Sequence, residues 1–325
     1  MHETRFIQLH VPDAAQLAAE AVQGLQASQA HASPKFFYDP LGSRLFDAIT
    51  QLDEYYPTRT EAAILSAHAA AITDAVHGAV GAGATMIDLG AGSCEKAARL
   101  LGPFQLERYV AVDISIDFLR QALVQLQRQH PAVQTVGVGL DFSSRLALPA
   151  GLVESPALVF YPGSSIGNFA PPAAVQLLRQ ARDISAGGAL LIGVDLLKPA
   201  AVLEPAYDDA LGVTAAFNLN LLRHLNRLVG SNFDLRQWQH VAFFNADADV
   251  SAGRVEMHLQ ARQALSVQWP GGERHFAAGE RIHTENAYKW TRPHFEALLH
   301  EAGFGRVQTW TDPQGWFAVM LAQAA

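Results

Sequence analysis

Short apolar runs alternate with longer amphipathic segments through the middle of the chain. The runs are bounded by turn-forming residues, and between them lie segments such as 116–129 and 172–184 with the spacing of helices. Strands that alternate with helices predict an α/β fold, in which a parallel sheet is covered by helices on both faces. The predicted strands are 85–89, 109–112, 135–138, 157–161 and 189–194.

The alternation is interrupted once, by the block 199–286. This block contains a predicted helix at 214–229, followed by strand-like stretches. After it, a helix at 293–302 and a hairpin of two strands, 306–310 and 316–322, complete the pattern. Five βα units closed by such a hairpin resemble the Rossmann-like sheet of class I methyltransferases. We therefore interpret the block as an insertion into that sheet.

Two domains follow from this interpretation. Helices are predicted before the first strand of the sheet, at 45–52 and 58–77. We expect these early residues to be shared between the sheet domain and an α+β domain built around the insertion. The sheet domain is predicted to comprise 60–198 with 287–325, and the α+β domain 1–59 with 199–286.

Charge and cysteine content narrow the function classes. The net charge is −8, and no run of Lys or Arg forms a basic stripe, which disfavours nucleic acid and anionic membranes as partners. Cys94 is the only cysteine, so no internal disulfide can form, as expected of a cytoplasmic protein. The first residues lack the apolar core of a signal peptide. The 13 histidines are scattered without metal-ligand spacing, and we expect no metal.

A glycine loop follows the first strand of the sheet. Gly90 and Gly92 lie between that strand and a helix, where glycine permits a tight turn and the close approach of a ligand. Asp113 ends the next strand, where a carboxylate can bind both hydroxyls of a ribose. Glu95 stands where dinucleotide-binding enzymes carry a third glycine, which argues against NAD. The alternative is a helix-capping loop beside a surface aspartate.

Three further residues are candidates for the same site. Asp141 and Phe142 follow the third strand, where the carboxylate could accept the amino group of adenine and the ring could lie on the base. Taken alone, a strand-end turn with a core Phe is the better explanation of these two residues. Lys96, in the first turn of the helix after the glycine loop, is either a solvated lysine or a contact to a cofactor carboxylate. Cys94 is interpreted as a small buried filler.

The chain resembles the ergothioneine-pathway histidine Nα-methyltransferases, also called hercynine synthases, from about Phe36 to its C-terminus. That family trimethylates the α-amine of histidine with three molecules of S-adenosylmethionine. The resemblance therefore implies the same cofactor, the same chemistry and a small amino-acid substrate. It is carried by the segments Phe37-Tyr38-Asp39-Pro40-Leu41-Gly42-Ser43, Glu54-Tyr55-Tyr56-Pro57-Thr58-Arg59, Leu89-Gly90-Ala91-Gly92-Ser93, Gly163-Ser164-Ser165-Ile166-Gly167-Asn168, Ala206-Tyr207-Asp208-Asp209, Gly212-Val213-Thr214-Ala215-Ala216-Phe217-Asn218 and Glu256-Met257.

The resemblance also assigns roles, with the α+β domain as the substrate-binding domain. Tyr55 and Asn168 are expected to orient the amine, and the ring of Tyr55 could face the quaternary cation that forms. The predicted cofactor contacts are Tyr38, Gly90, Gly92, Lys96, Asp113, Asp141 and Phe142. The predicted substrate contacts are Tyr55, Gly163, Asn168, Tyr207, Met257, Glu285 and the position of Ala287.

Ala287 departs from the family pattern. The family has a serine two residues after the glutamate that holds the imidazole, whereas this chain has alanine two residues after Glu285. One of two side-chain contacts to the ring is therefore missing. Three hypotheses remain open. The protein is a monomeric histidine Nα-methyltransferase, an enzyme that methylates another amino acid or amine in the same way, or a non-catalytic cofactor-binding protein with this fold.

Overall fold

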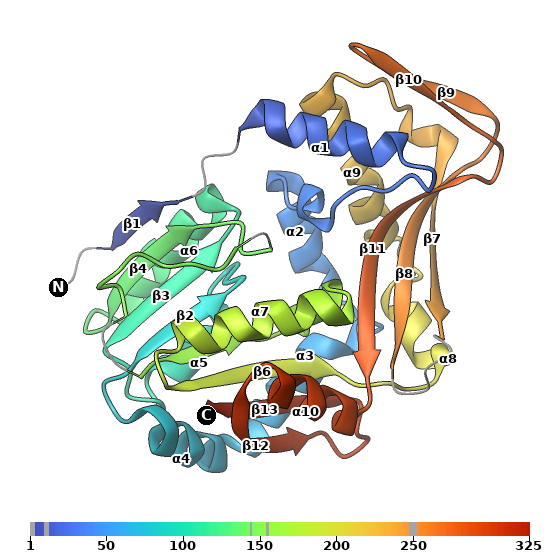
Figure 1. Cartoon of the computed structure of the whole chain (residues 1–325). Helices are drawn as coiled ribbons and strands as arrows, with labels where there is room; N and C mark the ends of the chain where they lie inside the picture. Colours follow the sequence, from blue (N-terminus) through green and yellow to red (C-terminus); the bar gives the residue numbers. More distant parts are fainter. Residues whose placement is uncertain (1–3, 10–12, 144, 154–155, 247–251) are drawn as a thin grey trace. The chain divides into compact units, whose positions relative to one another are not determined.

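The chain forms two compact units (Figure 1). The computed structural model describes residues 4–9, 13–143, 145–153, 156–246 and 252–325. Unit 1 comprises Met1–His10, Pro57–Leu197 and Lys289–Ala325. Unit 2 comprises Val11–Tyr56 and Lys198–Tyr288.

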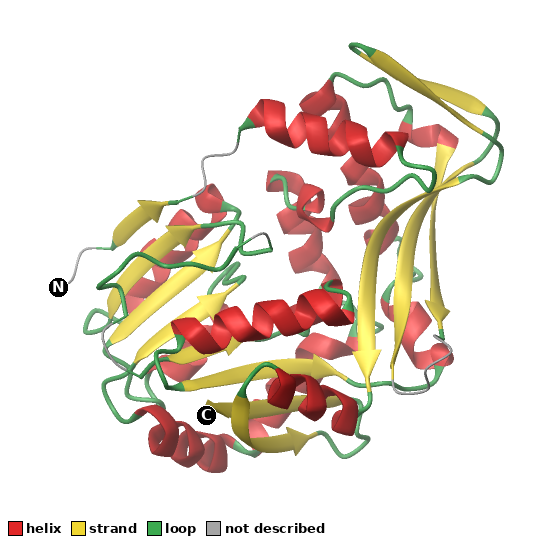
Figure 2. Cartoon of the chain, viewed as in Figure 1, coloured by secondary structure: helices red, strands yellow, loops and turns green. Residues whose placement is uncertain are grey.

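An eight-stranded sheet organises unit 1 (Figure 2), in the order β1-β4-β3-β2-β5-β6-β13-β12. Neighbouring strands from β1 to β6 are parallel, and β13 is antiparallel to both β6 and β12. The predicted α/β fold with a terminal hairpin is confirmed. The strands are β1 (Arg5–Gln8), β2 (Thr85–Leu89), β3 (Arg108–Asp113), β4 (Gln134–Gly139), β5 (Leu158–Tyr161), β6 (Ala189–Asp195), β12 (Phe304–Thr311) and β13 (Phe317–Ala324).

Strand β1 was not predicted. It pairs with β4, so these residues lie in unit 1, whereas the sequence led us to place 1–59 in the substrate-binding domain. Gly137 of β4 explains how β1 packs there, because a side chain at that position would lie 2.6 Å from the ring of Phe6. The added strand satisfies the backbone groups that β4 would otherwise expose at the edge of the sheet.

Helices cover the sheet of unit 1. Residues of α3, α4, α5 and α6 share one apolar core cluster with β2, β3, β5, β6 and β13. Helices α7 and α10 contact each other, α7 contacts β5 and β6, and α10 contacts β12. The helices are α3 (Tyr56–Ala67), α4 (Ala69–Val80), α5 (Glu95–Leu101), α6 (Ile116–Gln129), α7 (Pro171–Ile184) and α10 (Arg292–Glu301), with a short helix η2 (Ser165–Asn168) after β5.

The single helix predicted at 58–77 is instead the pair α3 and α4. His68 separates them with a non-helical backbone, and their axes meet at a bend of 78°. Apolar residues of both helices enter the same core cluster, which explains why their sequence pattern resembles one amphipathic helix. Among the described residues, no single helix is long and apolar enough to cross a bilayer, and α3 with α4 meets that criterion only as the bent pair.

The order in which the chain adds strands to the sheet changes direction once, between β2 and β5. From β2 the chain moves through β3 to β4 on one side, and β5 and β6 follow on the other side. The loops after β2 and β5 therefore diverge from adjacent strands. Such a switch point leaves a crevice at the carboxyl ends of the strands, where ligands of open α/β sheets bind.

Unit 2 packs helices on one face of a three-stranded antiparallel sheet. Helix α9 (Val213–Val229), close to the predicted 214–229, contacts strands β7 and β8 as well as α1, α2 and η1. Asp39 caps α2 through the N–H of Gly42 and accepts from Asn220 Nδ2 of α9. The remaining elements are α1 (Ala14–Gln26), η1 (Pro34–Phe37), α2 (Pro40–Ile49), α8 (Ala200–Leu203), η3 (Glu204–Ala206), η4 (Leu235–Gln237), β7 (Trp238–Asn245), β8 (Ala252–Ala261), β9 (Leu265–Trp269), β10 (Gly272–Phe276) and β11 (Arg281–Trp290).

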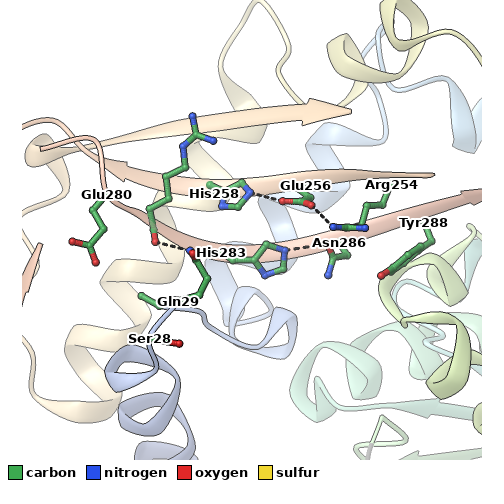
Figure 3. A pocket seen from close by; sticks show the side chains of 11 residues that line it. Ser28, Gln29, Arg254, Glu256, His258, Glu280, His283, Asn286 and Tyr288 are labelled. Carbon is green, nitrogen blue, oxygen red and sulfur yellow. Dashed lines mark hydrogen bonds and ion pairs between the residues drawn. The ribbon is translucent and has the colours of Figure 1, made fainter. Parts of the chain in front are cut away.

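A polar pocket of about 800 Å³ lies against β8 and β11 in unit 2 (Figure 3). Glu256 stands at its centre: one carboxylate oxygen lies 2.7 Å from Arg254 Nη2, and the other accepts from His258 Nε2 at 2.9 Å. The rings of His258 and His283 lie 5.1 Å apart, and His283 Nε2 is 3.1 Å from Asn286 Oδ1. One buried and one partly buried imidazole, those of His258 and His283, thus share the pocket with an arginine.

Burial lowers the pKa of His258 and of His283, although the Glu256 carboxylate opposes this for His258 and the Asn286 amide for His283. A histidine whose pKa falls on folding binds fewer protons in the native state than in the unfolded state. Its contribution to stability is therefore present above the unfolded pKa of about 6.5 and is lost as the pH falls through the folded pKa. Arg254 and Arg281, which line the same pocket, add repulsion when the imidazoles gain charge.

We predict that lowering the pH from 7 to 5 costs the wild type more in melting temperature than it costs the double variant His258→Gln with His283→Gln. Other groups add a slope that both proteins share, because burial lowers the pKa of His240 and raises the pKa of Asp88 to about 7. The control is His275→Gln, since the side chain of His275 is 74% exposed. Melting curves across this pH range test the idea, and equal slopes in the double variant and the wild type would refute it.

Candidate functional site

The glycine loop that follows β2 is hydrogen-bonded to Asp113, the last residue of β3. Gly90 and Gly92 have φ values of +70° and +52°, a left-handed conformation that favours glycine. The N–H of Gly92 donates to Asp113 Oδ2 at 2.9 Å, and the N–H of Ser115 donates to Oδ1 at 2.7 Å. Each oxygen of an ionised carboxylate keeps a further lone pair for a ligand. The structure thus brings together the residues predicted to hold a ribose.

Asp141 and Phe142 follow β4, which neighbours β3. Asp141 is buried, and its Oδ1 accepts from the N–H of Ser143 at 3.1 Å and from the Ser143 hydroxyl. The ring of Phe142 stands edge-on to Tyr161 at 6.0 Å, and a side chain at Gly90 would come within 3.8 Å of it. Phe142 therefore lies beside the glycine loop.

Lys96 is paired with a residue that the sequence did not single out. Its Nζ lies 2.6 Å from Glu61 Oε2, and the other oxygen of Glu61 accepts from the N–H of Gly163 at 2.8 Å. Glu61 is 2% exposed. The residue comes from α3, 35 positions before Lys96, and reads in the sequence as an ordinary acid near a helix start. Only its place directly after the Tyr55–Arg59 motif could have drawn attention to it.

Asp88 supplies a buried acid beneath the glycine loop. Its Oδ2 accepts from the Tyr109 hydroxyl at 2.6 Å, while its Oδ1 has no hydrogen-bond partner among the described residues. Burial raises the pKa of Asp88 to about 7, although Tyr109 and Lys96 lower it. Burial also raises the pKa of Asp113, opposed by the backbone N–H groups of Ser115 and Gly92.

These residues of unit 1 fit S-adenosylmethionine. Asp88 Oδ1 is buried without a hydrogen-bond partner among the described residues, and the left-handed glycines leave backbone accessible beside Asp113. The groups that the sequence predicts for ribose, for adenine and for the cofactor's carboxylate follow successive strands of the same sheet. Gly163 and Asn168, predicted to contact the substrate, lie on the loop after β5 in the same unit.

Three of the aromatic residues predicted to be functional, Tyr38, Tyr55 and Tyr207, lie in unit 2. The rings of Tyr55 and Tyr207 lie 6.3 Å apart in an edge-to-face arrangement. Tyr38, the predicted cofactor contact that lies in this unit, stands edge-on to Phe46 and Phe217 at about 6 Å. The structure therefore brings Tyr55 and Tyr207 together, whereas Tyr38 belongs to a different unit from the other predicted cofactor contacts.

Met257, Glu285 and Ala287 lie on the adjacent strands β8 and β11. The hydroxyl of Thr284 donates to the carbonyl of Met257 at 2.9 Å, and Met257 and Ala287 are both buried. None of the three lines the polar pocket of Figure 3. The flanking residues do: Glu256 and His258 on one strand, and Asn286 and Tyr288 on the other. Because side chains alternate along a strand, Met257 and Ala287 face away from that pocket.

Comparison with known proteins finds relatives along nearly the whole chain. A family model described as histidine-specific methyltransferase, SAM-dependent, matches residues 17–324. A histidine N-alpha-methyltransferase of Mycolicibacterium smegmatis is 40% identical over 322 residues, which cover 95% of this chain and 97% of that protein. Its counterpart in Mycobacterium tuberculosis is 39% identical over 314 residues, 94% of each chain.

A more distant relative is the N-methyltransferase imqF of Aspergillus flavus. It is 27% identical over 318 residues, which cover 94% of this chain and 84% of that protein. The family match extends over nearly all of the chain and includes the residues described above from both units. The chain therefore belongs to the family of histidine-specific, S-adenosylmethionine-dependent methyltransferases.

Proposed function

We propose that this protein transfers methyl groups from S-adenosylmethionine to the α-amine of L-histidine and carries the reaction through to the trimethylated product, hercynine. The observation that carries the proposal is the 40% identity to a histidine N-alpha-methyltransferase across 95% of the chain. The glycine loop with Asp113, a site suited to the cofactor, supports it. A cytoplasmic location and a monomeric state stay predictions.

The cofactor contacts are assigned by chemistry. Asp113 accepts from the ribose hydroxyls, Asp141 accepts from the amino group of adenine, and Phe142 lies against the base. Lys96 binds the carboxylate of the cofactor's amino-acid portion. When bound, the cofactor supplies an electrophilic methyl group on a sulfonium. Every further requirement falls on the protein.

The protein must hold a neutral amine in line with the methyl group, at about 3 Å, and exclude water. In each transfer a nitrogen–carbon bond forms as the sulfur–carbon bond breaks, and the amine must lose a proton before it can react again. Tyr55 and Asn168 orient the nitrogen lone pair. The paired rings of Tyr55 and Tyr207 offer aromatic surface, which stabilises the quaternary ammonium that ends the sequence.

The same chemistry on another amino acid is the second candidate, and Ala287 is the observation that favours it. Ala287 is buried on β11 and offers no hydroxyl where the family has serine. The less polar position could suit a different aromatic side chain. A screen of the proteinogenic amino acids plus histamine, with mass detection of methylated products, decides between the candidates and also detects a protein that only binds the cofactor.

Asp113→Ala should weaken the binding of S-adenosylhomocysteine by at least about a hundredfold, because two charge-assisted bonds worth roughly 1.5–3 kcal/mol each are lost. Isothermal titration calorimetry measures this directly. Asp117→Ala, a change at an exposed acid in the first turn of α6, should leave the affinity unchanged. Unaltered affinity in the Asp113 variant would remove the ribose assignment.

Histamine should be a poor substrate. We propose that Asn168 and Tyr207 hold the α-carboxylate and amine end of histidine, and histamine lacks that carboxylate. Loss of one such contact predicts methylation at least about tenfold slower than for histidine under subsaturating conditions. Steady-state rates with both compounds provide the comparison, and equal rates would contradict the proposed carboxylate contact.

Ala287→Ser should lower the KM for histidine by up to about tenfold, since a neutral hydrogen bond contributes about 0.5–1.5 kcal/mol. Glu285→Ala should raise KM by more than that factor, because a carboxylate makes the stronger bond to an imidazole N–H. Glu273→Ala, at an exposed position of strand β10, is the control. If the serine variant gains nothing for histidine and the wild type prefers another amino acid, the substrate assignment is wrong.

A further inference from the structure

Glu61 links three segments that meet at the switch point of the sheet. Its Oε2 lies 2.6 Å from Lys96 Nζ in α5, and its Oε1 accepts from the N–H of Gly163, after β5, at 2.8 Å. Helix α5 follows the glycine loop at the end of β2, and β2 and β5 are neighbours in the sheet. One carboxylate from α3 therefore ties together the two loops that diverge at the crevice.

The fold reserves space for this carboxylate. Gly193 of β6 faces it, and a side chain there would come 2.0 Å from Glu61 Oε1. A side chain at Gly163 would come 3.1 Å from Lys96 Nζ. Two glycines thus make room for the acid and for the ammonium. Glu61 is 2% exposed, whereas the side chain of Lys96 is 36% exposed, so the acid is the fixed partner and the ammonium the accessible one.

The geometry leaves Lys96 able to bind a second anion. An ammonium has three N–H donors, and the bond to Glu61 uses one of them. A lysine on a flexible four-carbon stem would otherwise move among solvated positions. Bonded to a buried carboxylate, its nitrogen is held beside Gly163 with donors left over. That place is the crevice in which ligands of such sheets bind.

We propose that Glu61 is a positioning residue for the cofactor: it holds the Lys96 ammonium where that ammonium binds the carboxylate of the cofactor's amino-acid portion. The inference rests on the proposed role of Lys96. A positioning role and a purely electrostatic role for Glu61 predict opposite changes in anion affinity when the acid is removed. Removing a negative charge near an anion site would strengthen anion binding, because Coulomb repulsion is relieved. Loss of the anchor would weaken it.

The test compares two ligands that share the adenosine portion. S-adenosylhomocysteine carries the amino-acid carboxylate, whereas 5′-methylthioadenosine lacks the whole amino-acid portion. The Kd of each is measured by calorimetry for the wild type, Glu61→Gln, Lys96→Met and the double variant. Glu61→Gln preserves the side-chain shape, and the unchanged binding of 5′-methylthioadenosine reports an intact adenosine site. Glu95→Gln, an exposed acid in the first turn of α5, is the matched control.

Glu61→Gln should weaken the binding of S-adenosylhomocysteine by about tenfold and leave the binding of 5′-methylthioadenosine unchanged. Lys96→Met should have a similar selective effect, and the double variant should lose little more than either single variant, because both act through one contact. The deciding quantity is the affinity for S-adenosylhomocysteine divided by the affinity for 5′-methylthioadenosine. If Lys96→Met leaves this ratio unchanged, the proposed role of Lys96 fails. If Lys96→Met lowers the ratio but Glu61→Gln leaves it unchanged or raises it, Glu61 has no positioning role. Equal weakening of both ligands by Glu61→Gln would show a purely structural ion pair.

Discussion

The pairing of β2 with both β3 and β5 is the constraint on which unit 1 depends. It places three loop systems at one edge of the sheet: the glycine loop after β2, Asp113 at the end of β3, and the Gly163 loop after β5. Hydrogen bonds then fix these loops against one another, through Asp113 on one side and Glu61 on the other. Both links use a carboxylate to hold backbone N–H groups, which orders loop backbone without regular secondary structure.

The central strands of this sheet were predictable because they are buried on both faces. Every residue of β2, β5 and β6 is buried, so each strand reads as a predominantly apolar run between turn residues. Features that depend on distant partners were not predictable. The helical pattern of residues 58–77 does not reveal the bend at His68. The residues next to Phe6 in the sequence do not indicate that Gly137 leaves room for its ring.

The residues of the candidate site also divide into some that the sequence could predict and some that it could not. Gly90, Gly92 and Asp113 could be chosen from the sequence because the ends of adjacent parallel strands lie at one edge. Glu61 could not, since its significance lies in contacts to Lys96 and Gly163, far away in the chain. In unit 2, Met257 and Ala287 became candidates through family resemblance alone. Their strand positions look like ordinary core, and the structure does bury both.

Asp88 gives the cofactor-binding unit a chemical property of its own. Burial raises the pKa of this carboxyl to about 7, so its ionised form is much less favoured there than in water. A cationic ligand bound close to Asp88 would favour the ionised form, whereas a neutral ligand would not. By linkage, two such ligands would differ in the number of protons that they release on binding. The heat of binding of each would then vary with the ionisation enthalpy of the buffer, and exchanging one for the other would move protons between the protein and the solution.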